Sequence, residues 1–168
     1  MKGKIIFRTL YFMPQVLSSV IVAIIWGWIY NPSYGALNTM LNGIGLSVLI
    51  PRTGFLGSQD FALLALFVAW SWVHYGFTMV IFIAGLSGID EVYFDAAKVN
   101  GANLWQQLRF VLIPFMRGSI TTAVLVTAIS AFQVFDLVFI MTNGGPGRST
   151  TVTTLYMINN AFFFQKVG

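Results

Sequence analysis

The feature that most constrains this chain is the length of its uncharged runs. No charged residue lies between Arg8 and Arg52, and a second run, from Phe61 to Ile89, is interrupted only by His74. A membrane-spanning helix needs about 20 predominantly apolar residues. The composition agrees, because 57% of the residues are hydrophobic and only 8% are charged, whereas about a quarter of the residues in soluble domains are charged. The sequence therefore predicts an all-α, polytopic membrane protein.

Three segments are predicted to cross the membrane, at about residues 13–30, 61–84 and 118–141. Pro14 suits the first turn of the first helix, and Asn31-Pro32 is a stop signal at its end. The second segment ends in a Gly-Leu-Ser-Gly sequence and the third in Thr-Asn-Gly-Gly-Pro, neither of which continues a helix readily. We expect residues 1–168 to form one partial membrane domain. The first apolar stretch is too long for a signal peptide, so we expect it to be retained.

The basic residues favour one orientation. With three spans, six of them lie on the side of the N-terminus and the 90–117 segment, and three lie on the other side. The six are Lys2, Lys4, Arg8, Lys98, Arg109 and Arg117, and the three are Arg52, Arg148 and Lys166. Because Lys and Arg concentrate in cytoplasmic loops, we expect the 90–117 loop to be cytoplasmic and the 31–60 loop to be extracytoplasmic.

The 90–117 loop is the polar segment between the second and third spans. Helix-end signals predict two short helices, at about 91–99 and 103–112, with Gly101 at the corner between them. Leu104, Leu108 and Val111/Leu112 recur at helical spacing and form an apolar stripe that suits a partner surface. The loop is either a docking element or an interfacial hairpin that only connects two spans, and these features leave both interpretations open.

The order of residues in this loop resembles the coupling loop of bacterial ABC importer permeases. That family carries Glu-Ala-Ala, then Gly, then Leu-Pro at fixed spacing, and here the matching residues are Asp95-Ala96-Ala97, Gly101-Ala102 and Ile113-Pro114. Asp95 shortens the usual Glu but keeps its charge, while Asn100 and Leu108 replace a common Asp and Phe. Flanking features resemble the carbohydrate branch, with permeases of maltose, lactose, multiple-sugar and glycerol-phosphate type: Arg8 with Phe12-Met13-Pro14, Trp26 with Asn31-Pro32 and Gly35, Ile83-Ala84-Gly85-Leu86, Phe135-Asp136, and Thr142-Asn143-Gly144-Gly145-Pro146.

The resemblance covers nearly the whole chain and implies a function. A permease subunit of the bacterial inner membrane would pass a sugar or related polyol phosphate inward by alternating access. The implied partners are a second permease subunit, ATP-binding cassette subunits, an extracytoplasmic solute-binding protein, the carbohydrate substrate and the lipid bilayer. Docking of the ATPase subunit would involve Asp95, Ala96, Ala97, Gly101, Ala102, Ile113 and Pro114. Permeases of this branch have further spans on both sides, so the chain resembles a fragment with the third, fourth and fifth spans.

Two ionisable residues within the predicted spans are candidates for a translocation path. His74, beside Tyr75 and several tryptophans, either lines a sugar path, where aromatic faces stack on sugar rings, or is a packed histidine bonded to a backbone carbonyl. Asp136 either makes an interhelical contact, meets another subunit or contributes to the passage. The sequence leaves these alternatives open.

Other function classes are disfavoured by what the sequence lacks. The basic residues are scattered, which argues against nucleic-acid binding. The chain has no cysteine and one histidine, so we expect no metal site. Gly144-Gly145-Pro146-Gly147 lacks the Gly-Lys-Ser/Thr ending of a phosphate loop, and no nucleophile–base set is apparent, so we expect neither a cofactor nor catalysis in this chain. The alternative from another class is a small ATP-independent channel, which would not explain the ordered pattern over residues 95–114.

Overall fold

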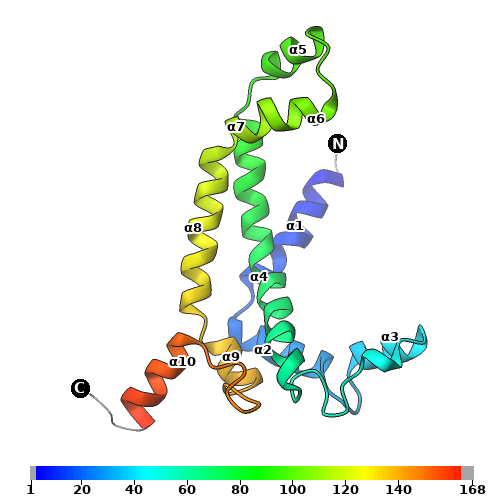
Figure 1. The fold of residues 1–168 in the computed structure, drawn as a ribbon, viewed down its shortest axis with the longest axis vertical. Helices are drawn as coiled ribbons and strands as arrows, with labels where there is room; N and C mark the ends of the chain where they lie inside the picture. The colour runs from blue at the N-terminus through cyan, green and yellow to red at the C-terminus, as the bar shows by residue number, and fades with distance from the viewer. Residues whose placement is uncertain (1–2, 164–168) are drawn as a thin grey trace.

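The computed structural model describes residues 3–163, and within that range the chain consists of helices and connecting turns without strands (Figure 1). The all-α class predicted from the sequence is confirmed. The longest helix, α4 (Gln59–Ser87), runs beside α8 (Arg117–Gln133), and α1 (Gly3–Val16) packs against α4. A hairpin joins the upper ends of α4 and α8 in Figure 1. It contains α5 (Glu91–Val99), α6 (Leu104–Gln107), the π-helical turn η2 (Leu108–Leu112) and α7 (Ile113–Phe115).

The opposite end of the molecule is built from short helices. These are α2 (Ser19–Ile29), α3 (Ala36–Gly43), the 3-10 turn η1 (Ser47–Leu49), α9 (Asp136–Met141), α10 (Thr153–Ile158) and the π-helical turn η3 (Asn159–Phe163). The hairpin and the start of α1 therefore lie toward one end, and the 31–60 loop and the segment after α9 lie toward the other (Figure 1). This is the relative placement that the alternation of three spans predicts.

Within the described range, α4 is the one helix that is both long and apolar enough to cross a membrane by itself. It contains the whole 61–84 segment. Two helix pairs meet the same criteria only when taken together, and both are bent: residues 6–16 with 19–29 by 100°, and residues 104–115 with 117–133 by 66°. The described residues thus contain up to three candidate spans, of which one, α4, is a single helix.

Residues 13–30 do not form the single helix that the sequence predicts. Pro14 lies in the last turn of α1 instead of the first turn of a new helix, and α2 begins only at Ser19. Proline has no N–H to bond the carbonyl four residues before it, and its ring crowds the preceding turn, so Pro14 weakens the last turn of α1. Ser18 has an extended backbone (φ −60°, ψ 139°), and the chain turns there. Pro14 thus precedes a helix break.

Residues 118–141 are also divided. The chain leaves the α8 helix at Val134, where ψ is 121°, and resumes a helix at Asp136 after Phe135, where φ is −135°. The break lets α9 pack against α2, and Leu137 and Val138 are buried there. An uninterrupted apolar run cannot reveal such a break, because the tertiary packing that causes it comes from another part of the sequence.

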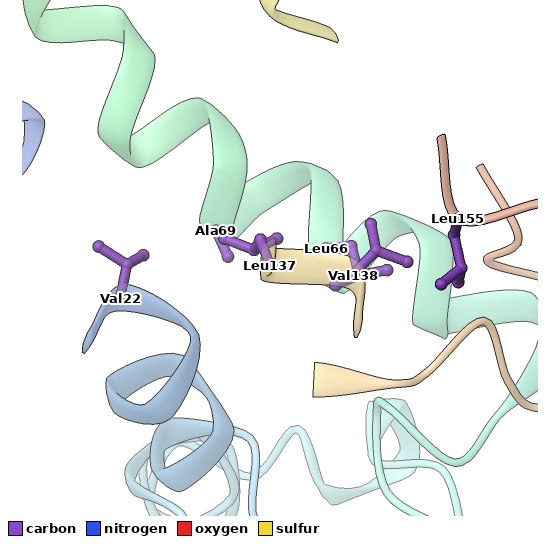
Figure 2. Close-up of a cluster of buried hydrophobic side chains, with 6 residues drawn as sticks. All are labelled: Val22, Leu66, Ala69, Leu137, Val138 and Leu155. Carbon is purple, nitrogen blue, oxygen red and sulfur yellow. The ribbon is translucent and has the colours of Figure 1, made fainter. Parts of the chain in front are cut away.

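The hydrophobic core lies at the end opposite the hairpin. Side chains from α2, α4, α9 and α10 meet in one buried cluster: Val22, Leu66, Ala69, Leu137, Val138 and Leu155 (Figure 2). Burying apolar groups of this size is the main contribution to stability that packing makes here. The cluster fixes the two helix breaks relative to α4.

Glycines let other helices approach α4 closely. A Cβ atom at Gly76 would collide with the backbone carbonyl of Tyr11 on α1, and one at Gly85 would collide with Ser119 on α8. Small residues at helix crossings are typical of packing in membranes, where close backbone contact replaces the hydrophobic driving force. These two crossings hold α1 and α8 against α4 and so position the base of the hairpin.

Candidate functional site

The corner of the hairpin is a Schellman motif that requires glycine. The α5 helix ends with Asn100 as its cap, and Gly101 follows at φ +76°. The Gly101 N–H donates to the Lys98 carbonyl (2.9 Å), and the Ala102 N–H donates to the Ala97 carbonyl (3.0 Å). This pair of bonds closes a helix through a residue in the left-handed region, which glycine adopts without a Cβ clash. The corner predicted at Gly101 is confirmed.

The second arm of the hairpin is capped at its start and bonded to the corner. Asn103 and Gln106 form a reciprocal capping box, with side chain-to-backbone bonds of 2.9 and 2.8 Å. The buried Gln107 amide donates to the Ala102 carbonyl at 2.8 Å. Both sides of the corner are therefore held by hydrogen bonds, and the hairpin has a defined shape in this chain alone.

The predicted docking residues divide into two groups. Five lie on α5 and the corner that follows it: Asp95, Ala96, Ala97, Gly101 and Ala102. The other two, Ile113 and Pro114, lie in α7 at the base of the hairpin, next to the start of α8 (Figure 1). The rings of Tyr93 and Phe115, whose centroids are 4.6 Å apart, pack α5 onto that base. The first group is therefore available to a partner, while the second joins the hairpin to the spans.

The surface around the corner combines charge with exposed apolar side chains. Asp95 accepts from Lys98 Nζ at 2.8 Å, and this hydrogen bond raises the pKa of Lys98. An exposed pair of this kind adds little stability. Val99 is 88% exposed and Leu104 is 84% exposed, on either side of Gly101.

The predicted apolar stripe on the second arm is only partly open. Leu104 is exposed, whereas Leu108 and Leu112 are half-buried. Trp105, which the sequence analysis did not single out, is exposed as well. Its position beside the apolar stripe could have predicted an exposed contact residue, since tryptophan is enriched at protein interfaces.

A polar cavity of about 300 Å³ lies where the two helix breaks face α4. Its polar lining comes from the end of α1, the start of α2, the middle of α4 and the α8–α9 break: Gln15, Ser19, His74, Ser130, Gln133 and Asp136. The structure thus brings together two of the three predicted path residues, His74 and Asp136. Tyr75 does not line this cavity. It lines a second, apolar cavity of about 700 Å³, which His74 also borders.

Hydrogen bonds join several of these polar groups. Ser19 Oγ donates to Asp136 Oδ2 at 2.6 Å, linking the start of α2 to the start of α9. His74 Nδ1 donates to the Trp70 carbonyl at 3.0 Å, and the two rings are stacked with centroids 4.2 Å apart. Among the described residues, Gln15 Oε1 is buried without a hydrogen-bond partner.

His74 and Asp136 each make a structural contact and also border the polar cavity. His74 is bonded to a backbone carbonyl, and Asp136 makes an interhelical contact, yet both border the cavity. Four lining residues were missed by the sequence analysis: Gln15, Ser19, Ser130 and Gln133. Their signal was a polar side chain within an apolar run, but only the helix breaks show that they converge.

The comparisons with known proteins assign the family. The family of binding-protein-dependent transport system inner membrane components matches residues 2–165. The chain belongs to this family. It is 33% identical over 156 residues to a probable ABC transporter permease of Pyrococcus horikoshii, covering 93% of this chain and 53% of that protein. It is 30% identical over 159 residues to the trehalose/maltose transport system permease protein MalF of Thermococcus litoralis, covering 95% of this chain and 52% of that protein.

A third relative is the diacetylchitobiose uptake system permease protein NgcF of Streptomyces coelicolor. The identity is 33% over 168 residues, covering 99% of this chain and 47% of that protein. The chain spans about half the length of the curated relatives it matches. Its fold matches a solved bacterial ABC transporter involved in the import of the acidic polysaccharide alginate, with a TM-score of 0.77 at 22% identity, over 98% of this chain and 57% of that one. The resemblance to ABC permeases of the carbohydrate branch is confirmed.

Proposed function

We propose that this chain forms part of the permease subunit of an ATP-driven importer that passes a sugar or related polyol phosphate into the cell. Relatives named for trehalose/maltose and diacetylchitobiose transport support the substrate class. ATP hydrolysis is assigned to separate ATP-binding cassette subunits, because the sequence contains no phosphate-binding loop. A second permease subunit and an extracytoplasmic solute-binding protein complete the proposed assembly.

The observation that carries this proposal is the hairpin of residues 90–117. A plain connector between α4 and α8 needs neither a glycine-dependent corner nor capped helices that extend past the ends of both spans (Figure 1). The hairpin presents Asp95, Ala96 and Gly101 on an exposed surface, with Ala97 half-buried and Val99 and Leu104 exposed beside them. Small residues permit close approach, and exposed apolar residues drive association. We propose that this surface docks on an ATP-binding subunit.

The polar cavity is the proposed part of the passage. Sugars are recognised by hydroxyl, amide and carboxylate groups together with aromatic faces, and the cavity offers all of these near Trp70 and His74. In transporters, substrate sites commonly lie where helices are discontinuous. Here the α1–α2 and α8–α9 breaks both adjoin the cavity. We propose that His74 and Asp136 contribute to the path, with Tyr75 lining its apolar neighbour.

The proposed orientation places the hairpin in the cytoplasm and the 31–60 loop outside. Single cysteines at Asn100 and Ser47, both exposed, would test this in a chain that has no native cysteine. On intact cells, a membrane-impermeant thiol reagent is expected to label Ser47→Cys and not Asn100→Cys. Permeabilised cells provide the control, in which both are expected to react. Labelling of Asn100→Cys but not Ser47→Cys on intact cells would reverse the topology and remove the docking role.

A further inference from the structure

Residues 36–50, called the lateral arm here, extend sideways from the helix bundle at the end opposite the hairpin (Figure 1). The arm consists of α3 and η1, and its principal helix contacts are with each other and with α2. Most of its side chains from Thr39 to Leu49 are exposed. The function proposed above gives this segment no role.

The α3 helix is amphipathic. Leu37, Met40, Leu41 and Ile44 recur at intervals of three and four residues and form one apolar face. Met40 is 67% exposed and Ile44 is 66% exposed, and Val48 in η1 is 93% exposed. The arm therefore exposes Met40, Ile44 and Val48, while Leu37 and Leu41 of the same helix are half-buried.

The polar face of α3 is partly bonded to the protein. Asn38 is buried and donates to the carbonyls of Asn31 and Pro32, both at 3.1 Å. Thr39 donates to the Gly35 carbonyl at 3.1 Å. The Thr39 bond is local to α3, whereas the two Asn38 bonds to residues before the helix fix how it is rotated about its axis, with Met40 and Ile44 exposed. The orientation of the apolar face is built into the chain.

The chemistry of the arm suits lipid better than a protein partner. Residues 9–51 contain no Lys, Arg, Asp or Glu, so the arm has no charge with which to form an ion pair with another subunit. Its exposed apolar residues are aliphatic or Met, and no aromatic anchor lies within residues 36–50. Trp28 and Tyr34, at its root, are both exposed, and these residue types concentrate at the membrane–water interface.

We propose that the lateral arm lies in the interfacial layer of the membrane, with Met40, Ile44 and Val48 in contact with lipid acyl chains. Interfacial amphipathic helices bury the apolar face about 5–10 Å into the headgroup–acyl boundary. Since the arm has no basic residue, its insertion depends on apolar area alone and not on anionic lipid. It braces the α2–α4 end of the bundle against the membrane surface.

Spin labels on the transporter reconstituted in liposomes test this proposal. Nitroxides are attached to Met40→Cys and Val48→Cys, with Asn42→Cys on the polar face as the matched control and the unsubstituted transporter as the background sample. The collision ratio of oxygen, which concentrates in lipid, to a water-soluble nickel chelate is expected to be several-fold higher at Met40 and Val48 than at Asn42. The same ratio is expected in zwitterionic and in anionic liposomes.

Two results would overturn the proposal. Equal nickel accessibility at Met40, Val48 and Asn42 would place the arm in water. Low accessibility of Met40 and Val48 to both reagents would show that another protein covers the apolar face. Neither result depends on sugar uptake, so the proposal can fail while the proposed transport function stands.

Discussion

Replacing Gly101 with valine is expected to leave membrane insertion normal, to weaken association with the ATP-binding subunits and to abolish sugar uptake. Gly101 has φ +76°, and a residue with a Cβ in that region costs about 1–2 kcal/mol, more when it is β-branched. The Schellman bonds to Lys98 and Ala97 hold the corner in this conformation. A hairpin tilted at Gly101 would present Asp95, Ala96 and Ala97 in the wrong place and could not transmit closure of the nucleotide subunits to the passage.

Two further variants separate the effect of the positive φ at Gly101 from the effect of added side-chain bulk. Gly101→Ala adds the smallest side chain and is expected to give a milder defect. Gly118→Val is the matched control, because Gly118 also has open space around its Cβ position but its φ is not positive. The measurements are co-purification of the ATP-binding subunit and ATP-driven uptake at equal permease abundance. Wild-type values of both for Gly101→Val would show that the hairpin is a plain connector.

Removing the carboxylate of Asp136 is expected to reduce uptake by about tenfold or more. Asp136 Oδ2 accepts a hydrogen bond from Ser19 Oγ at 2.6 Å, so the substitution breaks this link between α2 and α9. In the proposed path the Asp136 side chain also bonds a sugar hydroxyl, and loss of a bond of about 1.5 kcal/mol lowers affinity about tenfold. Because Asp136 also borders the cavity, Asp136→Ala removes both the interhelical bond and a polar group of the proposed path. Ser19→Ala removes the bond and leaves the carboxylate in place.

The comparison of these variants distinguishes a path residue from a structural one. Ser18→Ala is the control for Ser19→Ala, since the Ser18 side chain makes no cap bond. At matched abundance, Asp136→Ala is expected to raise the KM for sugar more than Ser19→Ala does, and Ser18→Ala is expected to match wild type. If Asp136→Ala instead changes only the abundance and thermal stability of the permease, to the same extent as Ser19→Ala, Asp136 is a structural contact and not part of the passage.

The local features of the hairpin could be predicted from the sequence because they depend on neighbouring residues. The corner at Gly101 and the helices on either side of it follow from capping and turn chemistry within a few positions. The α4 helix followed from a long apolar run. The first hairpin helix, α5, covers the expected residues 91–99, whereas the second, expected over 103–112, is α-helical only over Leu104–Gln107 and continues as the π-helical turn η2.

The helix breaks and the polar cavity could not be predicted in the same way. The apolar sequence around Pro14 is compatible with two structures: one in which the proline begins a helix, and one in which it precedes a helix break. The division at Val134 depends on the packing of Leu137 and Val138 into a cluster with α2 and α4, which are distant in sequence. Gln15 and Gln133 become neighbours only after both breaks form, so the cavity is a tertiary property.

In the proposed transporter, ATP hydrolysis by a separate subunit drives sugar through this permease. The most direct measurement is uptake of labelled sugar by liposomes that contain the complete transporter and its solute-binding protein, with ATP or ADP supplied on the hairpin side. Accumulation above the external concentration is expected with ATP, and none is expected with ADP or without the ATP-binding subunits. Equal entry of sugar under all three conditions, reaching but not exceeding the external concentration, would contradict the claim and identify an ATP-independent channel.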